Sequence, residues 1–246
     1  MKITAIIQAR MGSTRLPGKV LVDLAGETVL ARVVRRMQRA NLIDTVLIAT
    51  TVSPSDDRIV DEASRLNVDC FRGSEEDVLD RYWQASQKTL ADAVVRVTSD
   101  CPLIDPSLVD ATIQLFLDQQ ADYASNCTSR AYPRGLDVEI CTVKVLRRAW
   151  EDAREPYERE HVTPFFYEHP ELFRLAELKS KIDYSSHRWT LDTPDDLKLV
   201  RAIYEHFPGR DDFSWFEILK LVEENPSISA LNSHVSQKQL HGEFAG

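Results

Sequence analysis

The sequence lacks the features that mark secreted, membrane-spanning and nucleic-acid-binding proteins. Its four cysteines show no CxxC or other metal-ligand spacing, so we expect reduced thiols and no zinc site. No run approaches the roughly 20 apolar residues that span a bilayer, and the opening MKITAIIQAR reaches arginine too early for a signal peptide. A net charge of −9 disfavours binding to nucleic acid or to an anionic membrane. These absences predict a cytoplasmic protein.

The chain also lacks internal repeats and low-complexity tracts. Its 246 residues suffice for one substantial α/β domain and are few for two independent domains. We therefore predict a single domain over residues 1–224. A polar tail, residues 225–246, shows no clear periodicity, and we expect it to be partly disordered or docked on a partner subunit.

The first half of the chain alternates short β-rich runs with amphipathic helical runs. We expect strands at residues 3–7, 45–51, 69–71 and 93–98, with helices at 30–37, from 56, at 76–88 and at 106–117. This alternation predicts an α/β fold with a mostly parallel sheet and helices on both faces. Ligands of such sheets bind outside the carboxyl ends of the strands. Segments 8–19, 72–81 and 99–104 should therefore share one crevice.

The rhythm changes over residues 122–178. Two β-like runs, 123–127 and 136–143, flank an arginine-bearing turn at 130–135, and a helix is expected from residue 144. We interpret this segment as an insertion that covers the crevice or makes a dimer contact, and we expect a homodimer through residues 132–167. A strand at 187–191 and helices at 194–207 and 215–223 follow.

The loop QARMGSTRLPGK at residues 8–19 carries the strongest chemical signal. Glycines let backbone N–H groups approach a phosphate, and arginine side chains grip phosphate oxygens in pairs. The loop lacks the spacing of a Walker A or GxGxxG motif. A solvated basic surface loop is the alternative, but three cations at a strand end favour a phosphate site. The candidate residues are Gln8, Ala9, Arg10, Gly12, Ser13, Arg15 and Lys19.

Asp100 stands at the carboxyl end of a predicted buried strand, in the segment TSDCP. A carboxylate there can hold Mg²⁺, which prefers oxygen ligands and substrate phosphates. Capping of the next helix is the alternative, although Asp105 and Ser107 are better placed for it. Asp192, in LDTPDD, has a similar setting just before a predicted helix, where Asp195 or Asp196 could supply the helix N-terminal charge.

Six segments together resemble the cytidylyltransferases that activate sialic acids and 3-deoxy-manno-octulosonate, most closely the SpsF-like branch named for spore coat polysaccharide biosynthesis. They are QARMGSTRLPGK, RGSEEDVLDRY, VRVTSDCPLID, YPRGLDVEI, EREHVTPF and RWTLDTPDDL, in that order. The resemblance covers about residues 2–207. It implies a Rossmann-like, three-layer nucleotide-diphospho-sugar transferase fold.

The resemblance also implies roles for the candidate residues. The loop at residues 8–19 would bind the triphosphate of CTP, and Asp100 with Asp192 would hold Mg²⁺. The turn at residues 72–82 would read the base and ribose through Arg72, Gly73, Ser74 and Asp77. The alternative for this turn is a helix cap, because Ser74 and Asp77 fit an S-x-x-[DE] capping box.

The insertion supplies candidates for binding an acidic sugar. A sugar acid needs an arginine for its carboxylate and acids or amides for its hydroxyls. The candidates are Arg134, Gly135, Asp137, Glu139, Arg159 and His161. His161 could bind the sugar, help to deprotonate its hydroxyl or hold a dimer interface.

The expected reaction is attack of a sugar hydroxyl on the α-phosphorus of CTP, with release of pyrophosphate. Arg15, Lys19 and Asp100 are the expected catalytic residues, the two cations neutralising the departing pyrophosphate. The alternatives are another nucleoside triphosphate, a sugar phosphate or polyol phosphate as acceptor, a glycosyltransferase of similar fold, and a non-catalytic nucleotide-binding subunit.

Overall fold

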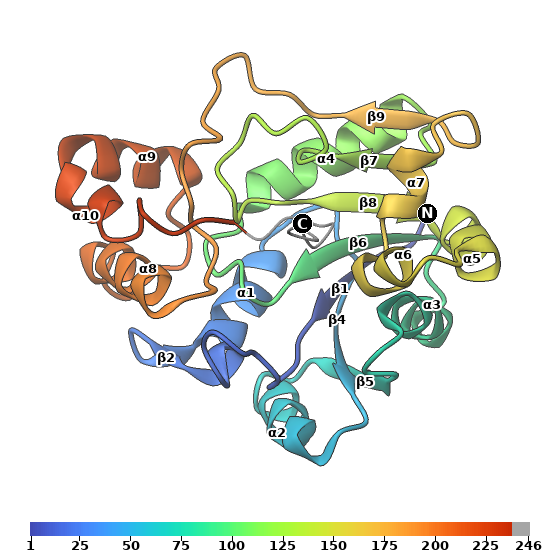
Figure 1. Ribbon diagram of the computed structural model, residues 1–246, viewed down its shortest axis with the longest axis horizontal. Helices are drawn as coiled ribbons and strands as arrows, with labels where there is room; N and C mark the ends of the chain where they lie inside the picture. Colours follow the sequence, from blue (N-terminus) through green and yellow to red (C-terminus); the bar gives the residue numbers. More distant parts are fainter. Residues whose placement is uncertain (238–246) are drawn as a thin grey trace, which may run out of the picture.

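The computed structural model describes residues 1–237. A seven-stranded sheet lies at the centre of the fold, with the strand order β5-β4-β1-β6-β8-β7-β9 (Figure 1). The strands are β1 (Ile3–Gln8), β4 (Thr45–Thr51), β5 (Asp69–Gly73), β6 (Ala93–Thr98), β7 (Tyr123–Ser125), β8 (Glu139–Thr142) and β9 (Leu175–Glu177). A separate hairpin pairs β2 (Asp23–Leu24) with β3 (Glu27–Thr28).

The sheet is parallel in its N-terminal half and mixed in its C-terminal half. β1 pairs in parallel with β4 and β6, and β4 pairs in parallel with β5. β8 lies antiparallel to both β6 and β7, and β9 joins β7 in parallel. The expectation of a mostly parallel sheet is confirmed. Residues 122–178, interpreted as an insertion, contribute three of their strands to this same sheet.

Helices cover both faces of the sheet. Alternate residues of each strand point to opposite sides, and both sets include apolar side chains that are buried against helices. Ile3, Ala5 and Ile7 of β1 pack with α1 (Val29–Met37), α2 (Asp57–Arg65) and α4 (Pro106–Asp118), whereas Ile6 packs with α3 (Val78–Thr89) and α5 (Val143–Asp152). A third cluster buries Trp189 against α8 and α9. The first helices are η1 (Lys19–Leu21), α1 (Val29–Met37), η2 (Pro54–Asp56), α2 (Asp57–Arg65), α3 (Val78–Thr89) and α4 (Pro106–Asp118). The later ones are α5 (Val143–Asp152), α6 (Pro156–His161), α7 (Pro164–Glu168), α8 (Pro194–His206), α9 (Trp215–Glu224) and α10 (Pro226–Ala230).

The expected strand at residues 187–191 is wrong. This segment makes only an isolated bridge between Arg134 and Arg188, although its alternating Trp189 and Leu191 are buried as a strand's would be. The neighbouring turn lies close to this segment at Gly135, which has a φ of +103° and where a Cβ would lie 2.6 Å from the backbone nitrogen of Thr190. Glycine is required at this position by both the dihedral angle and the contact.

The tail expected over residues 225–246 is partly helical. α10 packs against α8 and α9 at one end of the molecule (Figure 1), and the chain then continues toward the sheet. Residues 238–246 of the predicted tail lie outside the described residues. Over residues 1–237, no helix is both long and apolar enough to cross a bilayer. The homodimer through residues 132–167 stays a prediction.

Candidate active site

The loop that follows β1 is held in shape by the buried carboxylate of Asp56. Its Oδ1 accepts a hydrogen bond of 2.8 Å from the Met11 N–H, and its Oδ2 accepts from the hydroxyls of Thr50 and Thr51 at 2.9 and 2.6 Å. Burial disfavours the charged carboxylate, but these hydrogen bonds outweigh it and lower the pKa of Asp56. Gly18, with a φ of +68°, closes the loop by donating to the Met11 carbonyl. The loop is therefore shaped by the protein alone.

A cavity of about 270 Å³, called here the phosphate cavity, opens above this loop. It is lined by Gln8, Arg10, Gly12, Ser13, Thr14, Arg15, Lys19, Val20, Thr98, Ser99, Asp100 and Asp192. Every candidate from the loop lines it except Ala9. The Ala9 side chain is buried and its N–H donates to the Ala49 carbonyl, so this residue extends the sheet pairing instead.

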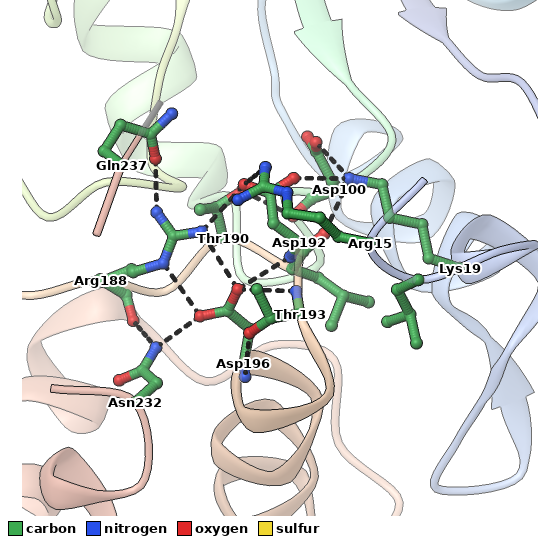
Figure 2. Close-up of polar contacts among 12 residues, drawn as sticks. Arg15, Lys19, Asp100, Arg188, Thr190, Asp192, Thr193, Asp196, Asn232 and Gln237 are labelled. Carbon is green, nitrogen blue, oxygen red and sulfur yellow. Dashed lines mark hydrogen bonds and ion pairs between the residues drawn. The ribbon is translucent and has the colours of Figure 1, made fainter. Parts of the chain in front are cut away.

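Lys19 joins the two predicted metal ligands (Figure 2). Its Nζ donates to Asp100 Oδ2 and to Asp192 Oδ1, both at 2.8 Å, and to the Leu191 carbonyl at 2.9 Å. Burial works against the ammonium, but the two carboxylates outweigh burial and raise the pKa of Lys19. Arg15 Nη2 lies 3.1 Å from Asp192 Oδ2. The site thus concentrates opposite charges at the cavity wall.

The two carboxylates suit Mg²⁺, which proteins commonly bind through one or two carboxylates plus substrate phosphates. The capping role falls to Asp105, whose carboxylate accepts from the N–H groups of Ser107 and Leu108, so Asp100 is free of it. Among residues 1–237, no group of three or more histidine, cysteine or acidic side chains could hold a metal ion. A cation at Asp100 and Asp192 would therefore complete its ligands with water or with substrate phosphate oxygens.

Asp192 is held in a strongly cationic setting. Besides Lys19 and Arg15, Arg188 Nη2 donates to Asp192 Oδ2 at 2.9 Å. Burial alone would raise the pKa of Asp192, but these three cations outweigh burial and lower it. This carboxylate is therefore ionised at neutral pH.

The predicted base-reading turn at residues 72–77 uses its charged side chains structurally. Arg72 pairs with Asp57 at 2.7 Å and donates to the carbonyls of Thr51 and Ser53. Asp77 caps α3 by accepting from the Asp80 N–H, so Asp77 and not Ser74 is the cap. Neither charged side chain lines the phosphate cavity.

The side chain of Glu75, in the same turn, lies close to the phosphate loop. A Cβ at Gly12 would lie 3.9 Å from Glu75 Oε1. Gly73 is confined by packing, since a Cβ there would lie 2.9 Å from the Phe71 ring and 3.0 Å from Arg81 Cγ. The Ser74 hydroxyl accepts from the Asp77 N–H at 3.0 Å and so fixes the turn. Protein contacts therefore engage the Arg72 and Asp77 side chains, and a base-reading role for this turn stays a prediction.

A second cavity adjoins the phosphate cavity and shares four of its lining residues. It has two overlapping lobes of about 290 and 380 Å³. The first lobe shares Arg15, Thr98, Asp100 and Asp192 with the phosphate cavity. Both lobes are lined by Arg96, Cys127, Arg134, Asp137, Glu139 and His161. Four of the six predicted sugar-binding residues therefore meet beside the two aspartates.

Arg134 is the cation of the second cavity that lacks a partner among residues 1–237. Asp137 is paired with Arg130 through two hydrogen bonds of 2.6 and 2.9 Å, and Glu139 is paired with Arg96 at 2.5 Å. Burial, with the positive charge of Arg130, lowers the pKa of Arg134. An arginine in this state gains most from an incoming anion.

Two predicted sugar-binding residues lie elsewhere. Arg159 pairs with Asp77 at 2.6 Å and donates to the carbonyls of Trp150 and Ala153, so it ties α6 to α3 and α5. Arg159 lines neither lobe of the second cavity, and its expected contact with a sugar stays a prediction. Gly135 contributes only the close backbone approach to residues 188–190 described above.

Sequence reasoning missed several residues of the site. Arg96 lines the second cavity from β6, and Thr98 donates to Asp100 Oδ1 at 2.6 Å. Both lie in the strand AVVRVT, where a polar residue at every second position of a buried strand is a usable signal. Arg188 and Gln237 also lie here, and no local pattern marks them.

Comparisons with known proteins agree with this geometry. The chain matches the family model described as Cytidylyltransferase over residues 4–209. An uncharacterised protein of Methanocaldococcus jannaschii is 38% identical over 97% of each chain. The spore coat polysaccharide biosynthesis protein SpsF of Bacillus subtilis is 35% identical over 92% of this chain and 96% of its own.

Two solved structures share the fold. A cytidylyltransferase from Leptospira borgpetersenii has a TM-score of 0.89 and 36% identity, covering 93% of this chain and 97% of its own. A CMP:2-keto-3-deoxy-manno-octonic acid synthetase complexed with CTP has a TM-score of 0.64, covering 84% of this chain and 100% of its own. At 20% identity the second likeness concerns the fold alone.

Proposed function

Because the chain belongs to the cytidylyltransferase family, we propose that it transfers CMP from CTP to an acidic sugar with the help of Mg²⁺, releasing pyrophosphate. The chain is a nucleotidyltransferase, and the transfer of CMP from CTP is the chemistry of its family. Mg²⁺, the acidic acceptor and a role in surface polysaccharide biosynthesis are the further parts of the proposal. The similarity to SpsF, named for spore coat polysaccharide biosynthesis, supports that role.

One observation carries the proposal: the phosphate cavity and the second cavity share Arg15, Thr98, Asp100 and Asp192. A triphosphate along the loop and a sugar in the second cavity would meet at these four side chains. Transferases that join two substrates need this arrangement, because holding both reactants in one geometry lowers the entropy cost of the reaction.

The residues of the chain divide the work of the reaction. The cations of the loop, Arg10, Arg15 and Lys19, bind the triphosphate and neutralise charge on the pyrophosphate as the bond from its oxygen to the α-phosphorus breaks. The acceptor hydroxyl forms the new bond to the α-phosphorus and gives up its proton to the surrounding water. Mg²⁺ held by Asp100 and Asp192 would supply further positive charge to the phosphate oxygens.

Arg134, which has no ion-pair partner among residues 1–237, supports an anionic acceptor. Its guanidinium fits a carboxylate, as in a 2-keto-3-deoxy sugar acid, with two donors side by side. The same guanidinium fits the phosphate of a sugar phosphate or polyol phosphate, which is the second candidate class. Asp137 and Glu139, beside it, offer oxygens to sugar hydroxyls.

The four unpaired cysteines favour the cytoplasm as the place of action.

The test is an assay of pyrophosphate release by the pure protein with each of the four nucleoside triphosphates and a panel of acceptors. The panel holds 2-keto-3-deoxy sugar acids, sugar phosphates, polyol phosphates and neutral sugars. We expect release with CTP and one sugar acid, and its loss when EDTA removes Mg²⁺. Release with a phosphorylated acceptor alone would overturn the acidic-sugar assignment. Activity that survives EDTA would overturn the metal assignment.

A further inference from the structure

The chain beyond residue 209, where the match to the family model ends, returns to the active site. After α10, the side chain of Asn232 is buried, with 3% of its surface exposed. Its Nδ2 donates to the Arg188 carbonyl at 2.9 Å and to Asp196 Oδ1 at 2.8 Å. Both hydrogen bonds of this buried amide nitrogen go to the segment around Asp192, so Asn232 fixes that segment as well as the C-terminal chain.

Asp196 passes this contact on to Asp192 (Figure 2). The Asp196 carboxylate is fully buried and accepts from Arg188 Nε at 2.9 Å and Nη2 at 3.1 Å. It also accepts from the backbone N–H groups of Asp192 and Thr193, both at 2.9 Å. Arg188 Nη2 donates in turn to the Asp192 carboxylate. Asn232 therefore holds both the backbone and the side chain of Asp192 through two intermediaries.

Gln237 extends the same network into the second cavity. Its Oε1 accepts from Arg188 Nη1, and its side chain lines the lobe that contains Asp100, Asp192 and Arg134. Figure 2 shows Gln237 and Asn232 approaching Arg188 from different directions. The amide nitrogen of Gln237 makes no hydrogen bond to a residue among 1–237, so it remains available to a ligand in the cavity.

We propose that Asn232 and Gln237 are part of the active site, with Asn232 a positioning residue for Asp192 and Gln237 a specificity-determining contact to the acceptor. The acceptor contact rests on the proposed function, whereas the positioning of Asp192 requires only that the protein binds CTP with Mg²⁺. Residues that orient a metal ligand typically contribute 10–100-fold to metal affinity or activity.

The positioning role is tested by calorimetry of CTP binding with Mg²⁺ and with EDTA. In the unaltered protein we expect Mg²⁺ to tighten CTP binding. In Asn232→Ala we expect most of that gain to be lost, by roughly tenfold, with binding in EDTA unchanged. Ser233→Ala is the matched control, because its exposed hydroxyl donates to the Ala230 carbonyl and to no other residue among 1–237. Equal weakening under both conditions would mean a merely structural role and would overturn the assignment.

The acceptor contact is tested by kinetics of Gln237→Ala and Gln237→Glu with the acceptor found above. We expect Gln237→Ala to raise the KM for the acceptor several-fold while kcat and CTP affinity stay unchanged. Gln237→Glu keeps an acceptor for Arg188 but adds a negative charge, so it should raise the KM of an anionic acceptor further. An unchanged KM in both variants would overturn the contact. If CTP binds but no acceptor reacts, the acceptor part of the proposed function fails, the Gln237 assignment falls with it, and the calorimetry still decides the role of Asn232.

Discussion

The parallel and mixed halves of the sheet build their cavities by different means. The phosphate cavity takes most of its wall from one continuous loop, residues 8–20, and from residues 98–100 at the end of the neighbouring strand. The second cavity takes most of its wall from β6 and β7, from residues 127–139, from His161, Thr163 and Tyr167, and from residues 190–192 and 237. The first is therefore local in sequence, whereas the second depends on contacts between distant segments.

The two cavities also differ in how their charges are balanced. In the phosphate cavity, Lys19 and Arg15 share Asp192, and Arg10 adds a further cation. In the second cavity, Asp137 and Glu139 each form an ion pair with an arginine, whereas Arg134 has no ion-pair partner among residues 1–237. The difference indicates that one side is built for a polyanion and the other for a ligand with a single anionic group and several hydroxyls.

Removing Asp100, which both cavities share, should have the largest effect. We expect Asp100→Ala to lower kcat by roughly 10²–10³-fold, because a charged group at the reacting centre is lost and Lys19 loses one of its two carboxylate partners. The fold should stay intact, because Lys19 keeps its hydrogen bonds to Asp192 and to the Leu191 carbonyl. The control is Asp195→Asn, whose exposed carboxylate pairs with Lys198 and His234. Comparable kcat values for the two variants would refute the shared role of Asp100.

Removing Arg134 should affect the second cavity alone. We expect Arg134→Leu to raise the KM for an anionic acceptor about 10- to 30-fold, the loss of one charge-assisted contact, while CTP affinity stays the same. A neutral sugar, if it reacts at all, should be used equally well by both proteins. Arg147→Leu on the surface of α5 is the control. Weakened CTP binding in Arg134→Leu would show that the two cavities do not divide the substrates in this way.

Removing the charge of Asp56 should affect the phosphate cavity alone. Asp56→Asn replaces a carboxylate that accepts from Met11 and two threonines, and we expect it to lower the free energy of unfolding by about 2 kcal/mol. Because the Met11 N–H anchors the loop, CTP affinity should fall as well, with the acceptor KM unchanged. Chemical denaturation and calorimetry measure the two effects. If the variant is destabilised but binds CTP with full affinity, the hydrogen bond from Met11 to Asp56 is not needed for the loop to bind CTP.

The pH dependence of stability should show the smallest of these effects. The pKa of Asp56 is lower in the folded chain than the roughly 3.9 of an unfolded aspartate, so its contribution is fully present above that value. As the pH falls through the folded pKa, the contribution is lost. Between pH 5 and pH 2, the free energy of unfolding measured by denaturation should therefore fall less with pH in Asp56→Asn than in the unaltered chain. The same pH dependence of the free energy of unfolding in both proteins would mean that Asp56 does not couple folding to protonation.

The same contrast explains what the sequence predicts. The bounds of β4 and β6 and the phosphate loop were predictable because strand periodicity and strand-end loops are local features. The partners of Arg72 and Arg159 were not, since tertiary packing decides which carboxylate an arginine meets. The apparent strand at 187–191 failed for a similar reason. Its buried alternation comes from packing against α8 and α9, not from a ladder.

The C-terminal contacts lay furthest from what sequence reasoning could reach. Asn232 and Gln237 stand in a polar stretch without periodicity, and only the folded chain brings them to Arg188. Asp196 resembled a simple helix-terminal charge, and its carboxylate does accept from the backbone at that position, but its burial against Arg188 depends on residues far along the chain.

A crystal structure of the protein with Mg²⁺ and a CTP analogue that cannot be cleaved at the α-phosphorus would test the central claim most directly. The account predicts the triphosphate along residues 8–19, a metal ion in contact with Asp100 and Asp192, and the α-phosphorus facing the second cavity beside Arg134. Phosphates bound elsewhere, or a metal ion that touches neither aspartate, would contradict it.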